Sequence, residues 1–297
     1  MFRQLLKCTS AIVMGLGLAA CSILYLPGSA NDRSGDGHRS QARGLQGPGA
    51  REHTFSQPPL SVSAEQAVSL GAAYRQQRSA VLQALGEHSP SGFKAGLTTT
   101  ASQQRFSLNE PIAGVLWPDS PIVYQGSPAI IRLSQYRRPM LEVELAFRVN
   151  ALIPEPLADV SEVRHVISEV MPAIELPDLG FESAVGVTGE AVVAANAGAR
   201  YFLIGAARPV AQVDVNAIRA TLSFNGTFQQ RAEATQVMGS QWRALYWLIN
   251  KMVGEGWVIQ PGQILLTGAM GEMLPLQEGV YQASFAGLGE ISLQVEQ

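Results

Sequence analysis

The chain of 297 residues is 46% hydrophobic and carries a formal charge of -3, so it can bury a substantial core in one large or two modest domains. This slight acidity argues against nucleic acid as a partner. Both cysteines, Cys8 and Cys21, lie near the N-terminus. The rest of the chain therefore has no thiol for a disulfide, a cysteine-bound zinc ion or a nucleophile.

The first 20 residues have the plan of a secretory signal peptide. Arg3 and Lys7 precede an uncharged stretch, and residues 11–18 form its apolar centre. Directly after this centre, Leu18-Ala19-Ala20-Cys21 resembles the bacterial lipobox, the site at which a cysteine is lipidated and becomes the new N-terminus. We therefore predict a signal peptide over residues 1–20 and a lipid anchor on the cysteine.

A lipid anchor on Cys21 predicts a location in the cell envelope, attached to the membrane. Ser22 follows it, rather than an aspartate, which favours the periplasmic side of the outer membrane. Two alternatives are secretion after Gly28-Ser29-Ala30 and an uncleaved anchor helix, because the uncharged stretch is just long enough to span a bilayer. Residues 21–57 are predicted to form a flexible tether that leads to a folded domain over residues 58–297.

The folded domain is predicted to begin with a helix. Ser63 and Gln66 match a capping box, apolar residues then recur at helical spacing, and Gly86 follows the last of them. The next segment, Gly92-Phe93-Lys94-Ala95-Gly96-Leu97-Thr98, is apolar except for one lysine, and a lone lysine is usually a surface residue. Strand-like runs separated by Pro, Gly and Ser fill residues 112–149.

A second helix is predicted from Asp159 and Glu162, which match a helix start, through Met171. A short strand over residues 172–178 should follow it. Glu175 interrupts the apolar run of this strand, as the two glutamates of the preceding strand also do.

A third helix begins at Ser240 and closes at Gly254 or Gly256, because apolar residues between them recur at helical spacing. The pattern as a whole indicates a mixed α+β domain, dominated by sheet in its second half. The remaining strands are predicted at residues 221–229, with a hairpin turn at Asn225-Gly226, at residues 264–268 and at residues 280–295.

Residues 141–147, Leu-Glu-Val-Glu-Leu-Ala-Phe, alternate as a strand does, which places Glu142 and Glu144 on one face. Two neighbouring carboxylates raise each other's pKa unless a cation or a donor lies between them, and Mg²⁺ and Mn²⁺ prefer oxygen ligands. The pattern fits either a metal site or an edge strand with a solvated acidic face. By itself it favours the solvated face.

Five segments taken together reverse this preference. They resemble the 2-keto-4-pentenoate hydratase branch of the fumarylacetoacetase superfamily, in the family's order and spacing. The resemblance implies an α+β, β-rich fumarylacetoacetase-like fold, in which a mixed sheet rolls around the active site and helices pack outside. The segments are Gly92-Phe93-Lys94-Ala95-Gly96-Leu97-Thr98, Asn109-Glu110-Pro111, Glu142-Val143-Glu144-Leu145-Ala146-Phe147, Pro172-Ala173-Ile174-Glu175 and Ile264-Leu265-Leu266-Thr267-Gly268.

The resemblance also implies a metal site and a class of substrate. Glu142, Glu144 and Glu175 match the three carboxylates that hold Mg²⁺ or Mn²⁺ in the family. A small 2-oxo or 2-hydroxy carboxylic acid would bind the metal through its carboxylate and adjacent oxygen, and the cation would stabilise the enolate that forms as water adds to the double bond. A homo-oligomer is one possible state of the protein.

Lys94 matches the catalytic lysine of the family, and the resemblance implies that it moves protons during tautomerisation. We expect a lysine that is buried beside a metal to have a lowered pKa, which suits proton transfer. Thr98, Thr267 and Gly268 are expected to orient the substrate through hydroxyl and backbone groups.

Several residues depart from the family pattern, and most of the departures concern proton transfer. Ile112 stands where an aspartate usually follows the Glu-Pro pair and partners the lysine. An isoleucine cannot carry a proton. The other departures are Ala195 and Gly198 in place of an aspartate and a serine around the retained Asn196, Gly180 in place of an arginine, and Gly239-Ser240-Gln241 in place of Gly-His-Pro.

Three functions fit this combination. The first is a hydro-lyase acting on a 2-hydroxy-2,4-dienoate or 2-oxo-4-enoate, with Glu110 or water replacing the missing acid; the family's roles lie in the breakdown of aromatic compounds. The second is a decarboxylase or hydrolase of a 4-oxalocrotonate or acylpyruvate-type acid. The third is an inactive, membrane-tethered binding lipoprotein. The first is preferred because the metal ligands and Lys94 are kept.

Overall fold

In a computed structural model of the protein, residues 69–181 and 187–297 are described. Its centre is a nine-stranded mixed sheet in the order β2-β1-β11-β5-β6-β7-β3, to which β12 adds beside β5 and β8 beside β6. The pairs β1–β11 and β3–β7 are parallel, whereas β5 is antiparallel to both of its neighbours. The strands are β1 (Gly92–Gly96), β2 (Ile112–Leu116), β3 (Pro121–Val123), β5 (Met140–Val149), β6 (Ile167–Leu176), β7 (Tyr201–Ile204), β8 (Arg208–Pro209), β11 (Ile264–Leu266) and β12 (Leu274–Pro275).

A second sheet has five strands in the order β10-β9-β13-β14-β4. The predicted hairpin is confirmed: β9 and β10 are joined by Asn225 and Gly226, whose φ angles of 48° and 77° suit a tight turn between antiparallel strands. The strands of this sheet are β4 (Ala129–Arg132), β9 (Arg219–Phe224), β10 (Thr227–Glu233), β13 (Gly279–Phe285) and β14 (Gly289–Glu296).

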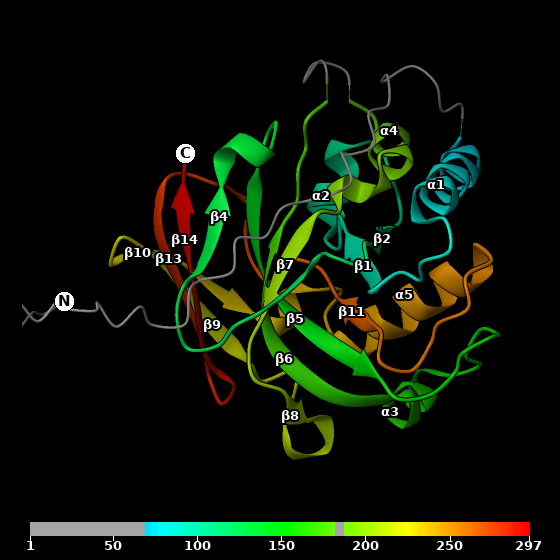
Figure 1. The fold of residues 1–297 in the computed structure, drawn as a ribbon. Coiled ribbons are helices and arrows are strands. Elements are labelled where there is room, and N and C mark those ends of the chain that lie inside the picture. Colours follow the sequence, from blue (N-terminus) through cyan, green and yellow to red (C-terminus); the bar gives the residue numbers. More distant parts are fainter. Residues whose placement is uncertain (1–68, 182–186) are drawn as a thin grey trace, which may run out of the picture. The chain divides into compact units, whose positions relative to one another are not determined.

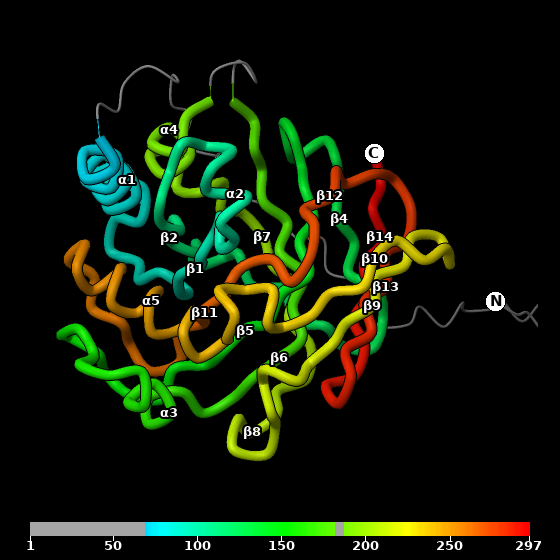
Figure 2. The backbone as a smooth tube through the Cα atoms, turned by 180° about the vertical axis from the view of Figure 1, so that it is seen from behind, coloured from blue at the N-terminus to red at the C-terminus, as the bar shows by residue number. Residues whose placement is uncertain are grey.

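The helices gather beside the nine-stranded sheet. In Figure 1, and in the reverse view of Figure 2, α1, α4 and α5 lie on one side of this sheet and the five-stranded sheet lies on the other. The α-helices are α1 (Leu70–Leu85), α2 (Thr100–Arg105), α3 (Val163–Val166), α4 (Gly189–Ala194) and α5 (Gln241–Gly254), and the 3₁₀ turns are η1 (Leu133–Gln135), η2 (Val160–Glu162), η3 (Asn196–Gly198), η4 (Val210–Gln212) and η5 (Ala234–Gln236). The predicted α+β class with dominant sheet is confirmed.

The long helices end where the sequence predicts. Gly86, with φ 56°, follows the last residue of α1, and α5 ends at Gly254. α1 begins at Leu70, because its N-cap Ser69 is extended (φ -161°, ψ 157°) and its side chain accepts a hydrogen bond from the N–H of Ala72 at 3.3 Å, so the predicted helix start at Ser63 is wrong. The predicted capping residues Ser63 and Gln66 lie outside the described residues.

The predicted helix from Asp159 through Met171 is wrong. Asp159 does start a helical segment, because its side chain accepts from the N–H of Ser161 at 2.8 Å, but the segment consists only of η2 and α3. From Ile167 onward the chain is β6, which pairs with β5 and is buried over most of its length. Pairing with a central strand therefore overrides the local helical signal, and the short strand predicted at residues 172–178 is the second half of β6.

The interpretation of residues 141–147 as a solvated edge strand is also wrong. They belong to β5, which lies in the middle of the sheet between β11 and β6. One face of β5 contributes Leu141, Val143 and Leu145 to the core, each no more than 1% exposed. Burying a side chain of this size stabilises the fold by about 1.5–3 kcal/mol.

No helix in the described part of the chain is long and apolar enough to cross a membrane. The predicted signal peptide, the lipidation site Cys21, the tether and the expected domain start at residue 58 lie outside the described residues. They remain predictions.

Candidate metal centre

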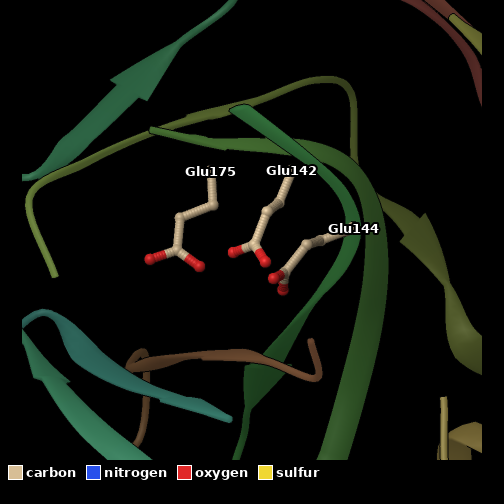
Figure 3. Close-up of side chains that lie close together, drawn as sticks. All are labelled: Glu142, Glu144 and Glu175. Atoms are coloured by element: carbon tan, nitrogen blue, oxygen red, sulfur yellow. The ribbon is translucent and has the colours of Figure 1, made fainter. Parts of the chain in front are cut away.

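Three glutamates converge on the face of β5 opposite Leu141, Val143 and Leu145. Glu142 and Glu144 are two residues apart on β5 and therefore share a face. The antiparallel register places Glu175 of β6 directly opposite Glu142. One oxygen from each of the three carboxylates lies within 4.8 Å of the others, and Figure 3 shows the three groups side by side. Among the described residues, no other group of acidic, histidine or cysteine side chains meets in this way.

The convergent carboxylates are largely removed from water. Glu144 and Glu175 have no exposed surface, and Glu142 is partly buried. Glu144 Oε2 accepts a hydrogen bond from the N–H of Gly268 at 2.9 Å. Glu144 Oε1 and Glu175 Oε2 are buried and accept no hydrogen bond from any described residue. A buried acceptor left unpaired costs about 1–3 kcal/mol and more if it is charged, so the donor set fits a hard divalent cation.

The pKa values of Glu142 and Glu144 are raised by their surroundings. Burial raises the pKa of Glu142 to about 7, against the attraction of Lys94, and the charge of Glu175 adds to the rise. Burial, followed by the charges of Glu175 and Glu142, raises the pKa of Glu144 well above its ordinary value, against the opposing effects of Lys94 and the Gly268 N–H. A divalent cation would remove the mutual repulsion that causes part of these shifts.

Lys94 of β1 faces the same carboxylates and is 3% exposed. Its ammonium group forms an ion pair with Glu175 Oε1 and donates to the carbonyl oxygen of Ala197 at 3.2 Å. Burial by itself would lower the pKa of Lys94, but the charges of Glu175, Glu142 and Glu144 outweigh it and raise the pKa above 10.5. The surrounding side chains by themselves therefore raise the pKa of Lys94, whereas a lowered pKa is expected for this lysine beside a metal.

The carbonyl group that meets Lys94 is held by an asparagine. Asn196 and Ala197 both adopt positive φ angles, 55° and 51°, which is uncommon outside glycine. The Asn196 side chain offsets this strain: its Oδ1 accepts from the N–H of Val115 at 2.7 Å, and its Nδ2 donates to the carbonyl oxygen of Val115 at 2.8 Å. The turn therefore presents the Ala197 oxygen to Lys94, a contact that the sequence analysis missed.

The predicted substrate-binding residues lie near the carboxylates but differ in what they contact. Gly268 donates its N–H to Glu144, and Thr98 packs against Gly268, where an added Cβ would lie 2.6 Å from Thr98 Cγ2. Thr267 is fully buried, and its hydroxyl donates to Gln241 Oε1 at 2.6 Å. A role in binding substrate stays a prediction for Thr98, Thr267 and Gly268.

The residues that depart from the family pattern leave Lys94 without a second acid partner on β2. Ile112 begins β2 and is buried, with its side chain packed toward Gly96. Glu110, the suggested replacement for the missing acid, has its Oε1 3.8 Å from Lys251 Nζ on α5. A role for Lys94 in proton transfer stays a prediction.

Asp178, which follows β6, serves the backbone near the start of β5. Its two carboxylate oxygens accept from the N–H groups of Arg137 at 3.0 Å and Arg138 at 2.7 Å. Gly180, found where the family pattern has an arginine, lies against Arg137: an added Cβ would come within 2.4 Å of the Arg137 Cβ. A larger residue at this position would therefore displace Arg137.

Comparison with known proteins places these observations in context. No family model matches the sequence. The sequence is 28% identical over 204 residues to 2-keto-4-pentenoate hydratase 1 of Dechloromonas aromatica, covering 68% of this chain and 76% of that protein. This relative is named as an enzyme, and its name agrees with the branch that the sequence resembles.

Two solved structures share the architecture. The 4-oxalocrotonate decarboxylase from Pseudomonas putida G7, complexed with magnesium and adipate, superposes with a TM-score of 0.72 at 22% identity, over 80% of this chain and 91% of that chain. Fumarylpyruvate hydrolase from Pseudomonas aeruginosa, in complex with Mn²⁺ and pyruvate, gives a TM-score of 0.52 at 15% identity, over 82% and 99% of the two chains. The chain has the fumarylacetoacetase-like fold.

Proposed function

We propose that the protein is a divalent-metal-dependent hydro-lyase of the 2-keto-4-pentenoate hydratase branch, acting on a 2-hydroxy-2,4-dienoate or its 2-oxo-4-enoate form. The observation that carries the proposal is the meeting of Glu142, Glu144 and Glu175 around buried oxygens that accept no hydrogen bond from the described residues. The name of the hydratase relative supports it. The small acids and the Mg²⁺ and Mn²⁺ ions bound by proteins of this fold support it as well.

In the proposed reaction the three glutamates would hold the cation, Mg²⁺ or Mn²⁺. When bound, the cation supplies a Lewis acid that withdraws charge from the oxygens of a 2-oxo acid. The sheet shields the carboxylates of Glu144 and Glu175 from bulk solvent, since neither has exposed surface, and the lower polarity strengthens each electrostatic contact there. Orientation of the carboxylates by the strand pair β5–β6 is thus the main contribution of the fold.

Lys94 would handle the proton. Its ammonium group forms an ion pair with Glu175 and donates one hydrogen bond to the Ala197 carbonyl oxygen. A lysine fixed in this way can deliver a proton to a carbon atom that gains charge and recover it from water. Because Ile112 stands where an aspartate is usual, Lys94 would carry out both the delivery and the recovery of the proton.

The test is the ultraviolet absorbance of 2-hydroxypenta-2,4-dienoate, which should decay with Mg²⁺ or Mn²⁺ and stop decaying with excess EDTA. Glu175→Ala should be inactive. Glu169→Ala is a matched control, because Glu169 lies on the same strand but pairs with Arg148 at 2.6 Å and is 35% exposed. A native protein that binds Mn²⁺ tightly and leaves the dienoate unchanged would instead support the binding lipoprotein.

A decarboxylase is the second candidate function. The fold neighbour with a TM-score of 0.72 is a 4-oxalocrotonate decarboxylase. Loss of CO₂ leaves its bonding electrons on a dienolate that needs one proton, and Lys94 alone can supply one proton, so this chemistry needs no acid at the position of Ile112. Release of CO₂ from 4-oxalocrotonate, without decay of the dienoate, would favour this function over hydration; hydrolysis of an acylpyruvate would favour the hydrolase.

We also propose that the enzyme is a lipoprotein of the cell envelope. The lipobox-like Leu18-Ala19-Ala20-Cys21 after the apolar stretch supports this location. The native chain should fractionate with the membrane and take up labelled palmitate, and Cys21→Ser should abolish the labelling. A Cys21→Ser chain that stays in the membrane without a change in mass would support the uncleaved anchor helix, and native chain in the medium would support secretion.

A further inference from the structure

Gln241, the first residue of α5, is fully buried and has a partner at each of its polar groups. Its backbone N–H donates to Asn216 Oδ1 at 2.8 Å, and its side-chain Nε2 donates to the carbonyl oxygen of Ala234 at 2.8 Å. Its side-chain Oε1 accepts from the Thr267 hydroxyl at 2.6 Å. A buried amide bound at both ends has one orientation, and it imposes that orientation on its partners.

Thr267 is joined by one peptide bond to Gly268, whose N–H contacts the carboxylate site. Thr267 follows the last residue of β11, and the next N–H, that of Gly268, donates to Glu144 Oε2. Gly268 has φ 107°, and Thr98 occupies the space where its side chain would be. The peptide between Thr267 and Gly268 is therefore fixed on one side by the bond to Gln241 and on the other by close packing.

We propose that Gln241 is a positioning residue of the carboxylate site: it fixes Thr267 and thereby the Gly268 N–H that orients Glu144. The inference rests on the proposed function, because Glu144 is one of the three carboxylates assigned to the cation. With Oε2 held by the Gly268 N–H, Oε1 of Glu144 is the oxygen left for the ion. Groups that orient metal ligands in this way typically affect metal affinity by about 10- to 100-fold.

The experiment measures Mn²⁺ affinity of the full chain by titration calorimetry, with thermal stability recorded in parallel. Gln241→Met and Thr267→Val keep the size of each side chain and remove the bond, so each should weaken Mn²⁺ binding by about tenfold. Gln241→Met also removes the bond to Ala234, and Thr267→Val the 3.4 Å bond to the Leu145 carbonyl oxygen. Because both variants remove the bond between Gln241 and Thr267, the double variant should weaken Mn²⁺ binding by less than the product of the two single effects. Thr267→Ser keeps the hydroxyl and should bind as the native protein does.

Gln263→Met provides the matched control. Gln263 immediately precedes β11, as Thr267 immediately follows it, and it is 6% exposed. Its side chain also makes two hydrogen bonds, accepting from the N–H of Gln260 at 2.8 Å and donating to the carbonyl oxygen of Pro90 at 2.9 Å. Neither bond leads to a carboxylate of the site, so this variant should lose stability and keep its Mn²⁺ affinity.

The outcomes separate the inference from the function on which it rests. If Gln241→Met and Thr267→Val lose stability but bind Mn²⁺ as tightly as the native chain, the residue is merely structural and the inference is overturned, while the proposed function stands. If the native chain binds no Mn²⁺, the proposed function fails and the inference fails with it. Should Gln241→Met not fold, the comparison of Thr267→Val with Thr267→Ser decides, and equal affinities overturn the inference.

Discussion

Replacing Lys94 by methionine removes the positive charge beside the three glutamates and keeps most of the side chain. The ion pair with Glu175 is buried, with 3% and 0% of the two side chains exposed. Removing one partner of a buried pair costs about 3–5 kcal/mol, because it leaves the other charge uncompensated. At about 2–4 °C of melting temperature per kcal/mol for a domain of this size, the metal-free Lys94→Met protein should melt roughly 6–20 °C below the native protein.

Mn²⁺ should reverse this loss, because it supplies the positive charge that the lysine supplied. Lys94→Met should therefore regain most of its melting temperature in Mn²⁺, bind Mn²⁺ at least as tightly as the native chain, and turn over no substrate. The assays are differential scanning fluorimetry with and without Mn²⁺ and titration calorimetry.

Lys251→Met is the control for Lys94→Met, because Lys251 is partly buried and pairs with Glu255 at 3.1 Å on the far end of α5. Its smaller loss of stability should not respond to Mn²⁺. If Lys94→Met melts with the native protein in the absence of metal, or if Mn²⁺ restores both variants equally, the assignment of Lys94 as the counter-ion of Glu175 is refuted.

Three further predictions follow from the site. Glu142→Ala and Glu175→Ala should each stay soluble and lose Mn²⁺ binding in calorimetry; full affinity in both would place the ion elsewhere. The pKa of Glu142 is raised from 4.5 to about 7, so the folded metal-free protein binds the proton of this carboxyl group more tightly than the unfolded chain does. The melting temperature of the metal-free protein should therefore fall as the pH rises from 4.5 to 7. Over the same range Mn²⁺ affinity should rise by about tenfold per pH unit as the proton leaves, and a flat profile would contradict this. Gly268→Ala should lower the free energy of unfolding by about 1–3 kcal/mol more than Gly262→Ala does. Both glycines have a positive φ, but only at Gly268 would an added Cβ meet a neighbour, Thr98. Equal melting temperatures of the two variants would rule out this crowding.

Local sequence patterns correctly predicted those elements that are determined by neighbouring residues. The Asn225-Gly226 turn, the end of α1 at Gly86 and the span of α5 depend on a few adjacent residues, and the structure contains all of them. The segment from Asp159 to Met171 failed for the opposite reason. Its second half is drawn into β6 by pairing with β5, a contact that no local pattern reveals.

The residues of the site also divide into those that a local pattern predicts and those that depend on distant parts of the chain. Alternation on β5 placed Glu142 and Glu144 on one face, but the central place of β5 in the sheet depends on its pairing with β6 and β11, and β11 lies far along the chain. The resemblance to a family supplied Glu175 and Lys94. The sequence marked Gln241 only as part of a departure from the family pattern, and nothing in it predicted the bond to Thr267, which lies 26 residues away along the chain.

In the proposed enzyme Glu142, Glu144 and Glu175 jointly bind one divalent cation, and anomalous diffraction from crystals grown with Mn²⁺ would locate it. We expect one strong peak within bonding distance of an oxygen from each glutamate, about 2.0–2.2 Å away for a hard divalent ion of this size. A Mn²⁺ peak elsewhere, or carboxylates that turn away from one another around Lys94 while the metal is in excess, would contradict it.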